Sequence, residues 1–259
     1  MCLVIFAHRV VPEYPLIVAA NRDEFHARPT QPAHFWASHP GVLAGRDEEQ
    51  GGTWMGVTRG GRFAAITNYR DPARTAPAPR SRGELPLDFL AGRHSPGDYL
   101  SSLGETAGEY AGFNLLVGDS QALWYFSNSD GNPPAELTPG IYGLSNAHLD
   151  TPWPKSELGK EHLSALLDGH SRGDALDHDA LAATVADRHT ATAADLQPLG
   201  LEGEMEQLLS SQFIVSPGYG TRSRTTLWTT RGGHAHWREQ SFGESGELRG
   251  EQQEVFALS

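Results

Sequence analysis

The sequence is poor in cysteine: Cys2 is the single cysteine among 259 residues. One cysteine excludes an intrachain disulfide framework and a zinc site built from several cysteines. Long apolar runs are also missing, since the early runs at 3–7 and 16–20 span five residues each, whereas a membrane-spanning helix needs roughly 18. No basic residue precedes the first run, as a secretory signal would require. We therefore expect a cytoplasmic protein without membrane insertion, whose thiol stays free.

Basic residues are few as well. Lysine and arginine number 20 against 32 acidic residues, giving a net charge of −12, which argues against a nucleic-acid partner. The 12 histidines are scattered, and His234 and His236 share a strand face without a third ligand nearby, so we predict no metal site. Neither a repeat nor a linker divides the chain, so we predict a single domain over residues 1–259.

Short apolar runs separated by turns dominate the pattern. Such runs are too short for helices and are typical of buried strands. We expect strands at 2–7, 16–20, 53–57, 63–68, 114–118, 123–127, 141–145, 225–229, 234–238 and 254–258. We expect helices near 85–90, from 95 onward, and within 156–209, one of them at 174–188. Strands and helices alternating in blocks predict an α+β fold of layered, mostly antiparallel sheets.

The position of the cysteine carries a chemical option. Removal of Met1 would leave Cys2 with a thiol and a free α-amine, whose ordinary pKa of about 7.7–8.0 suits a general base. An N-terminal amine that activates its own side chain is a known form of nucleophilic catalysis. The alternative is that Cys2 is a small buried apolar residue that opens a strand.

A polar block, Asn21-Arg22-Asp23-Glu24, directly follows the apolar run at 16–20. If the first two strands form a hairpin, this block lies beside Cys2. Asp23 would then hold the α-ammonium, and the Arg22 charge would favour the thiolate. The other interpretation is a solvated turn with a helix-capping aspartate.

Several motifs occur in a fixed order along the chain. Together with Cys2 and the polar block at 21–24, they resemble the NRDE family, which includes homologues of the transport and Golgi organisation protein. The matching motifs are Ala27-Arg28-Pro29, Ala44-Gly45-Arg46-Asp47, Gly51-Gly52-Thr53-Trp54-Met55-Gly56, Thr67-Asn68-Tyr69-Arg70, Ser81-Arg82-Gly83, Gly112-Phe113-Asn114-Leu115, Gly143-Leu144-Ser145-Asn146 and Tyr219-Gly220-Thr221-Arg222. This family in turn resembles the cysteine N-terminal-nucleophile hydrolases, such as penicillin V acylase and conjugated bile acid hydrolases.

The resemblance implies a four-layer αββα sandwich and a set of catalytic roles. The backbone amide of Asn68 and the side-chain amide of Asn146 match donors to an oxyanion, and Arg222 matches an arginine near the thiol, with Arg224 as the other candidate. The acylases carry an arginine where this chain has Ala20. Here the arginine is Arg22, which strand alternation turns away from its neighbours in the block.

The remaining candidates are side chains for substrate binding. We assign this role to Asn21, Arg22, Trp54, Tyr69, Arg70 and Arg82. The proline-broken stretch at 71–82 is either a lid over the pocket or a surface loop without a role.

The favoured function is cleavage of a C–N amide bond in a small molecule by Cys2, with no cofactor. The alternative is a carrier without catalysis that binds haem or an acyl lipid in the same fold, as links of the family to haem handling and lipid homeostasis imply. In that case Cys2 or His8 would be a ligand. The oligomeric state is not assigned.

Overall fold

The computed structural model describes residues 2–70, 78–169 and 175–259. The first sheet has the strand order β10-β1-β2-β12-β13-β14, with β11 paired to β12, and the second has the order β3-β4-β5-β6-β7-β8-β9. Every strand pairing in both sheets is antiparallel.

The strands are β1 Cys2–Val11, β2 Tyr14–Phe25, β3 Thr30–Trp36, β4 His39–Asp47, β5 Met55–Thr58, β6 Phe63–Asn68, β7 Phe113–Gly118, β8 Leu123–Ser127, β9 Ala135–Glu136, β10 Gly140–Leu144, β11 Val215–Ser216, β12 Tyr219–Thr229, β13 His234–Phe242 and β14 Leu248–Ala257. The helices are α1 Glu84–Ala91, α2 Pro96–Leu103, α3 Pro154–Asp168, α4 His178–Ala183, α5 Ala193–Leu196 and α6 Glu204–Leu209. Two short 3₁₀ helices lie at Ala107–Glu109 and Gln197–Leu199.

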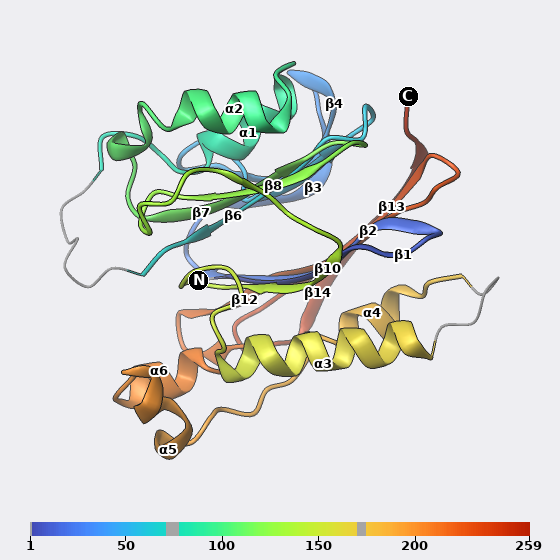
Figure 1. The fold of residues 1–259 in the computed structure, drawn as a ribbon. Coiled ribbons are helices and arrows are strands. Elements are labelled where there is room, and N and C mark those ends of the chain that lie inside the picture. Colours follow the sequence, from blue (N-terminus) through green and yellow to red (C-terminus); the bar gives the residue numbers. More distant parts are fainter. Residues whose placement is uncertain (1, 71–77, 170–174) are drawn as a thin grey trace.

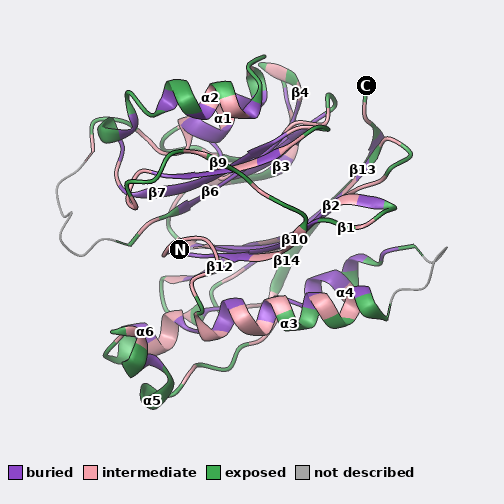
Figure 2. Cartoon of the chain, viewed as in Figure 1, coloured by how far each residue is buried: buried purple, intermediate pink, exposed green. Residues whose placement is uncertain are grey.

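The elements form four layers, as Figure 1 shows. Helices α1 and α2 cover the outer face of the second sheet, and α3 and α4 cover the outer face of the first. Buried residues fill the strands between them, and exposed residues lie on the outward faces of the helices (Figure 2). The expected four-layer αββα sandwich is confirmed. None of the described helices is long and apolar enough to cross a membrane.

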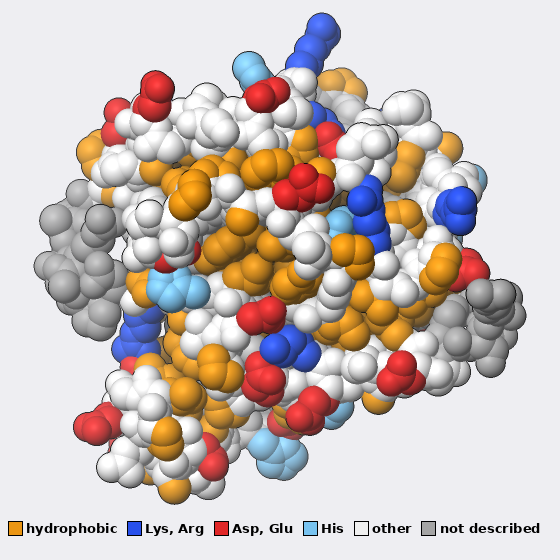
Figure 3. Space-filling view, in the orientation of Figure 1, with side chains coloured by type: hydrophobic (Ala, Val, Ile, Leu, Met, Phe, Trp, Pro, Cys, Tyr) orange, Lys and Arg blue, Asp and Glu red, His pale blue; other side chains and the backbone are white. Residues whose placement is uncertain are grey.

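The alternation of side chains along β1 and β2 determines which residues face the other sheet and which face the helices. Val4, Phe6, Val18 and Ala20 belong to the core between the two sheets. Their neighbours at odd positions, such as Leu3, pack against α3 and α4. Because side chains alternate between faces with a period of two, Cys2 lies on the inter-sheet face of β1. Where this apolar core reaches the surface, it is visible as a band between the helical layers, with scattered acidic side chains around it (Figure 3).

Most of the expected strands are present in the structure. The differences from the expectation concern mainly strands that contain polar residues. The strand expected at 16–20 continues through the polar block to Phe25, so the solvated turn at 21–24 is wrong. The sequence reading missed β3 and β4. Of the helix expected at 174–188, α4 covers only His178–Ala183, and residue 174 lies outside the described residues.

Candidate active site

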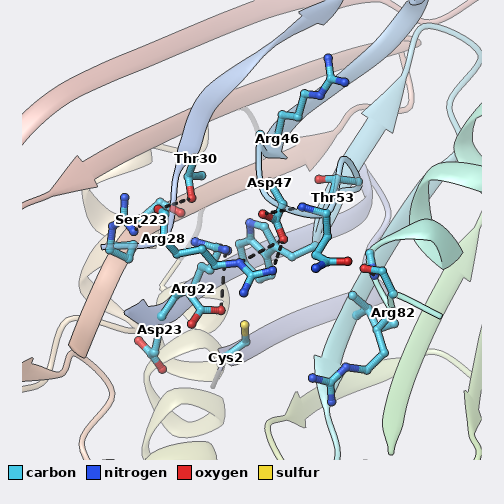
Figure 4. Close-up of a pocket in the computed structure, with 18 of the residues that line it drawn as sticks. Cys2, Arg22, Asp23, Arg28, Thr30, Arg46, Asp47, Thr53, Arg82 and Ser223 are labelled. Atoms are coloured by element: carbon cyan, nitrogen blue, oxygen red, sulfur yellow. Dashed lines mark hydrogen bonds and ion pairs between the residues drawn. The ribbon is translucent and has the colours of Figure 1, made fainter. Parts of the chain in front are cut away.

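A cavity of about 640 Å³ lies between the sheets, and Cys2 is part of its wall. Strands of both sheets contribute to the wall: β1, β2, β12, β13 and β14 of the first, and β3, β4 and β6 of the second. Figure 4 shows the Cys2 sulfur at the centre of the group of side chains drawn, with arginines above it and to one side. The single cysteine of the chain therefore lies on the wall of this cavity.

The hairpin of β1 and β2 brings the polar block to the thiol. Cys2 pairs with Arg22 across the two strands. Residues opposite each other in antiparallel strands point to the same face, so Arg22 shares the inter-sheet side with Cys2. Arg22 is 7% exposed, and its Nη2 atom lies 3.8 Å from Glu24 Oε2. This register agrees with the expectation that Arg22 faces away from Asn21 and Asp23.

Asn21 points to the other face of β2 and does not line the cavity. Its side-chain amide donates to the carbonyl oxygens of Val185 and Gln212, both at 2.7 Å. The side chain of Gln212 in turn donates to the carbonyl of Lys155 in α3 at 3.1 Å. Asn21 thus ties the first sheet to the helical layer, so the geometry gives it a structural rather than a substrate-binding position.

Asp23 lies in a buried polar cluster beside Cys2. Its Oδ1 atom accepts a hydrogen bond from Thr221 Oγ1 at 2.7 Å, and its backbone amide acts to lower the pKa of the Cys2 thiol. Burial raises the pKa of Asp23, while the Lys155 charge and the Thr221 hydrogen bond lower it. The carboxyl group is therefore next to the nucleophile and electrostatically coupled to it.

Lys155 is a site residue that the sequence reading missed. It is 2% exposed in the first turn of α3, and its Nζ atom donates to the carbonyl of Leu209 at 2.9 Å. Burial lowers its pKa, and the charges of Asp23 and Cys2 act in the opposite direction. The helix dipole disfavours a lysine at the N-terminus of a helix. The position of Lys155 directly after Pro154, at the start of α3, is therefore the sequence signal that could have identified it.

The two predicted oxyanion donors lie at adjoining segments. The side-chain amide of Asn146 donates to the carbonyl of Asn68 at 2.8 Å, and Ser145 Oγ donates to the carbonyl of Cys2 at 2.8 Å. The Tyr69 amide bonds Gly112 of the neighbouring segment. Since hydrogen bonds alternate along an antiparallel pair, the Asn68 N–H points away from β7. Asn68 lines the cavity. Asn146 is buried, and it is not among the residues of the cavity wall.

Arg222 and Arg224 lie at different places relative to the cavity. Arg222 lines the cavity, and its Nη1 atom donates to the carbonyls of Phe25 at 2.8 Å and Arg28 at 3.0 Å. Arg224 instead binds Gln240 Oε1 at 2.8 Å, away from the cavity. Arg222 therefore holds the turn after β2, and Arg22 is the cation across from the thiol.

The other substrate-binding candidates divide between two places. Trp54 and Arg82 line the cavity, and the Arg82 guanidinium donates to the carbonyl of Gly112 at 3.0 Å. Tyr69 bonds His148 Nε2 at 3.1 Å, and Arg70 forms an ion pair with Glu206, so both lie outside the cavity wall. Of the loop expected at 71–82, residues 71–77 lie outside the described residues, and residues 78–82 line the cavity.

The titration of the thiol offers a direct check of this geometry. Burial raises the pKa of Cys2, the Asp23 carboxylate raises it further, and the Arg22 guanidinium lowers it. Alkylation follows the thiolate fraction, so at a fixed pH below the pKa we expect Asp23→Asn to react several-fold faster and Arg22→Gln several-fold slower. Rates of iodoacetamide labelling from pH 6 to 10 measure both changes. Arg93→Gln, an exposed arginine away from the cavity, is the control, and shifts of equal sign in the two variants would contradict the arrangement.

Fold and site together define a class. The chain is a four-layer αββα sandwich, in which a cysteine at the start of the first strand lies on the wall of a cavity between two antiparallel sheets. The family model for Transport and Golgi organisation 2 matches residues 1–244. The chain belongs to this family.

Individual relatives agree with this assignment. The chain is 37% identical over 260 residues to the human Transport and Golgi organization protein 2 homolog, with 93% of each chain covered. Identity is 34% to the mouse homolog at the same coverage, and 29% to the Drosophila melanogaster protein, with 66% of each covered.

Solved structures of enzymes resemble it more distantly. A Caenorhabditis elegans N-acylethanolamine-hydrolyzing acid amidase ortholog aligns with a TM-score of 0.46 and 8% identity, covering 71% of this chain and 86% of that one. A mutant conjugated bile acid hydrolase from Clostridium perfringens aligns with a TM-score of 0.46 and 10% identity, covering 100% and 92%.

Proposed function

We propose that this protein is an amidohydrolase that cleaves a C–N bond in a small molecule, with Cys2 as nucleophile once Met1 has been removed. The observation that carries the proposal is the position of Cys2, on the cavity wall and opposite Arg22 in the neighbouring strand. A structural cysteine that only opened a strand would have no need of a cavity lined by polar side chains.

The proposed reaction begins with attack of the Cys2 sulfur on the amide carbonyl carbon. The α-amine takes the thiol proton and transfers it to the leaving nitrogen as the C–N bond breaks, which leaves a thioester on Cys2. Water then attacks the thioester carbon and gives a proton to the amine. The C–S bond breaks, the carboxylic acid is released, and the amine returns the proton to the Cys2 sulfur. The thiol, the α-amine and water supply the nucleophiles and the proton transfers of this reaction, so the proposed mechanism uses no cofactor.

The oxyanion formed in each step needs fixed donors. The Asn68 N–H, which is turned away from β7, and the amide of Asn146, which is held on the Asn68 carbonyl, are the two groups proposed for it. Donors of this kind contribute about 2.7–4 kcal/mol each to the stabilisation of a transition state. Asp23 would position the α-amine, and Lys155 and Thr221 would keep Asp23 in place.

The test begins with the N-terminus. Intact-mass measurement establishes whether the purified chain begins at Cys2, and a matched preparation that retains Met1 is the comparison. We expect the Met-free protein to form a thioester adduct of defined mass with an activated amide at neutral pH, and the Met-retaining protein to form none. Equal adduct formation by both preparations would overturn the role of the amine.

A carrier without catalysis is the other function that the family resemblance raises. No histidine is among the described residues that line the cavity. His8 is six residues from Cys2 along β1, about 20 Å in an extended strand, so the two side chains cannot bind one haem iron. Spectral titration of the wild type and the Cys2→Ala variant with haem tests whether the thiol alone acts as a ligand.

A further inference from the structure

The charge of the cavity is opposite to that of the whole chain. Among the described residues, seven arginines and four carboxylates line it, an excess of three positive charges in a protein whose net charge is −12. The arginines are Arg22, Arg28, Arg46, Arg80, Arg82, Arg222 and Arg249, and the carboxylates are Asp23, Glu24, Asp47 and Glu239. Grouping arginines in a concave site raises the local concentration of anions.

Ion pairs within the protein neutralise only some of these arginines. Arg28 binds Asp47 at 2.7 Å, and Arg80 and Arg249 bind carboxylates on the surface. In the described part of the chain, Arg82 has no carboxylate within 4 Å. The Arg46 guanidinium lies over the Trp36 ring, 5.1 Å from its centroid, and its side chain extends away from Cys2 (Figure 4). Arg82 also interacts electrostatically with Cys2, which places its charge near the nucleophile.

Arg22 adds a second, independent observation. Its side chain is 9% exposed, and its buried Nη1 atom has no hydrogen-bond partner among the described residues. A buried guanidinium N–H without an acceptor is costly and rare in native proteins. The distance of 3.8 Å between Arg22 Nη2 and Glu24 Oε2 is too long for a hydrogen bond. The wall of the cavity beside the thiol thus contains a cationic donor that no described residue accepts from.

Near neutral pH the carboxyl group of Glu239 contributes less than a full negative charge to the cavity wall. Glu239 is 3% exposed, and its Oε1 atom accepts a hydrogen bond from the Ala33 amide at 2.7 Å. Burial raises the pKa of Glu239 to about 7. Below neutral pH this group is largely protonated, and the excess of positive charge over the cavity is then larger.

We infer that the molecule bound beside Cys2 is an acidic one, an amide that carries a carboxylate or phosphate group, which Arg22 and Arg82 recognise. This rests on the proposed function for the amide, while recognition of the acid depends only on the arginines. The planar guanidinium matches the paired oxygens of both acids. Trp54, Ile66 and Phe242 give the same cavity an apolar part for the rest of the molecule, and its volume suits a small organic ligand.

Binding to the Cys2→Ala variant tests the inference without any need for catalysis. Three probes share one acyl group: N-benzoylglycine, N-benzoyl-O-phosphoethanolamine and the neutral N-benzoylethanolamine. We expect calorimetry at low salt to show at least one acidic probe binding tenfold or more tighter than the neutral probe, since hydrogen bonds to charged groups are the stronger ones. Which acidic probe binds better identifies the acid. Equal affinity for all three probes would overturn the inference.

Arginine variants locate the site. Arg22→Gln and Arg82→Gln, each in the Cys2→Ala background, should weaken the preferred acidic probe about tenfold and leave the neutral probe unchanged. Arg93→Gln removes the same charge from an exposed position away from the cavity and should change neither. Tight acid binding without amide cleavage by the Met-free protein would defeat the proposed function alone. Cleavage of the neutral amide in preference to both acidic amides would defeat this inference alone.

Discussion

The Cys2→Ala variant is expected to lose amide cleavage almost completely, by roughly 10⁴-fold or more, as removal of a covalent nucleophile does in other hydrolases. The thiol is the only group on the cavity wall proposed to form a covalent bond with the substrate, and alanine cannot form one. The remaining groups, including the Asn68 amide and Asn146, would stabilise an oxyanion that is no longer formed. Turnover of the best amide substrate, measured with excess variant, checks the loss.

A matched control separates chemistry from folding. Cys2 is half-buried at the end of β1, so alanine in its place removes one sulfur atom and leaves the strand pairing with Arg22 intact. We expect the thermal midpoint of Cys2→Ala to stay close to that of the wild type and its cavity to keep its ligand affinity. A variant that folds normally and keeps full turnover would show that the thiol is not the nucleophile.

Gly52→Ala is expected to destabilise the protein by about 3 kcal/mol or more, an extreme case of overpacking. A Cβ atom at this position would overlap the carbonyl carbon and oxygen of Gly83 and lie 2.8 Å from its Cα atom. These are backbone atoms, fixed further by the hydrogen bond from the Thr53 amide to the Gly83 carbonyl at 3.0 Å, so no change of rotamer relieves the overlap. Urea denaturation measures the loss in the free energy of unfolding.

Gly41→Ala is the matched control for this prediction. Gly41 also lies in the second sheet region, in β4, and a Cβ atom there would meet nothing within 4 Å. We expect its free energy of unfolding to remain within about 0.5 kcal/mol of the wild type. If Gly52→Ala were as stable as Gly41→Ala, the close approach of the two backbone segments at 52 and 83 would be wrong.

The two glycine motifs show what a sequence pattern leaves open. The pairs Gly51-Gly52 and Arg82-Gly83 were visible as family motifs, but they are some 30 residues apart and nothing local links them. In the fold, the two segments cross so closely that side chains are excluded, and Thr53 and Arg82 are thereby placed on the same cavity wall. This reason for glycine is steric and long-range, so no local rule finds it.

The strands that the sequence missed have an equally physical explanation. β3 contains Pro32 and several polar residues, which argue against a strand in the interior of a sheet. It is, however, an edge strand of the second sheet, where proline is tolerated because one row of backbone groups is unpaired. β4, with Pro40 and two glycines, gains its stability from pairing with β3 and β5.

The turn that is the alternative interpretation of the polar block at 21–24 has a similar origin. Polar residues after an apolar run usually mark the end of a strand. Here β2 continues because each face supplies partners: Asn21 finds backbone carbonyls of the helical layer, and Asp23 finds Thr221. The pattern cannot reveal such partners, since Val185, Gln212 and Thr221 are 160 or more residues away in the chain.

The sequence by itself determined the layered α+β fold and the family, and it singled out Cys2 as the candidate nucleophile. These follow from local apolar periodicity and from motifs that are read in order, and neither needs three-dimensional contacts. Tertiary structure alone decided which arginine faces the thiol, placing Arg22 across from Cys2 and Arg222 on the turn after β2. It also brought Lys155 to Asp23 and collected seven arginines around one cavity of an acidic protein. Net charge is a sum over the chain, whereas the field in a cavity depends on which few side chains the fold turns inward.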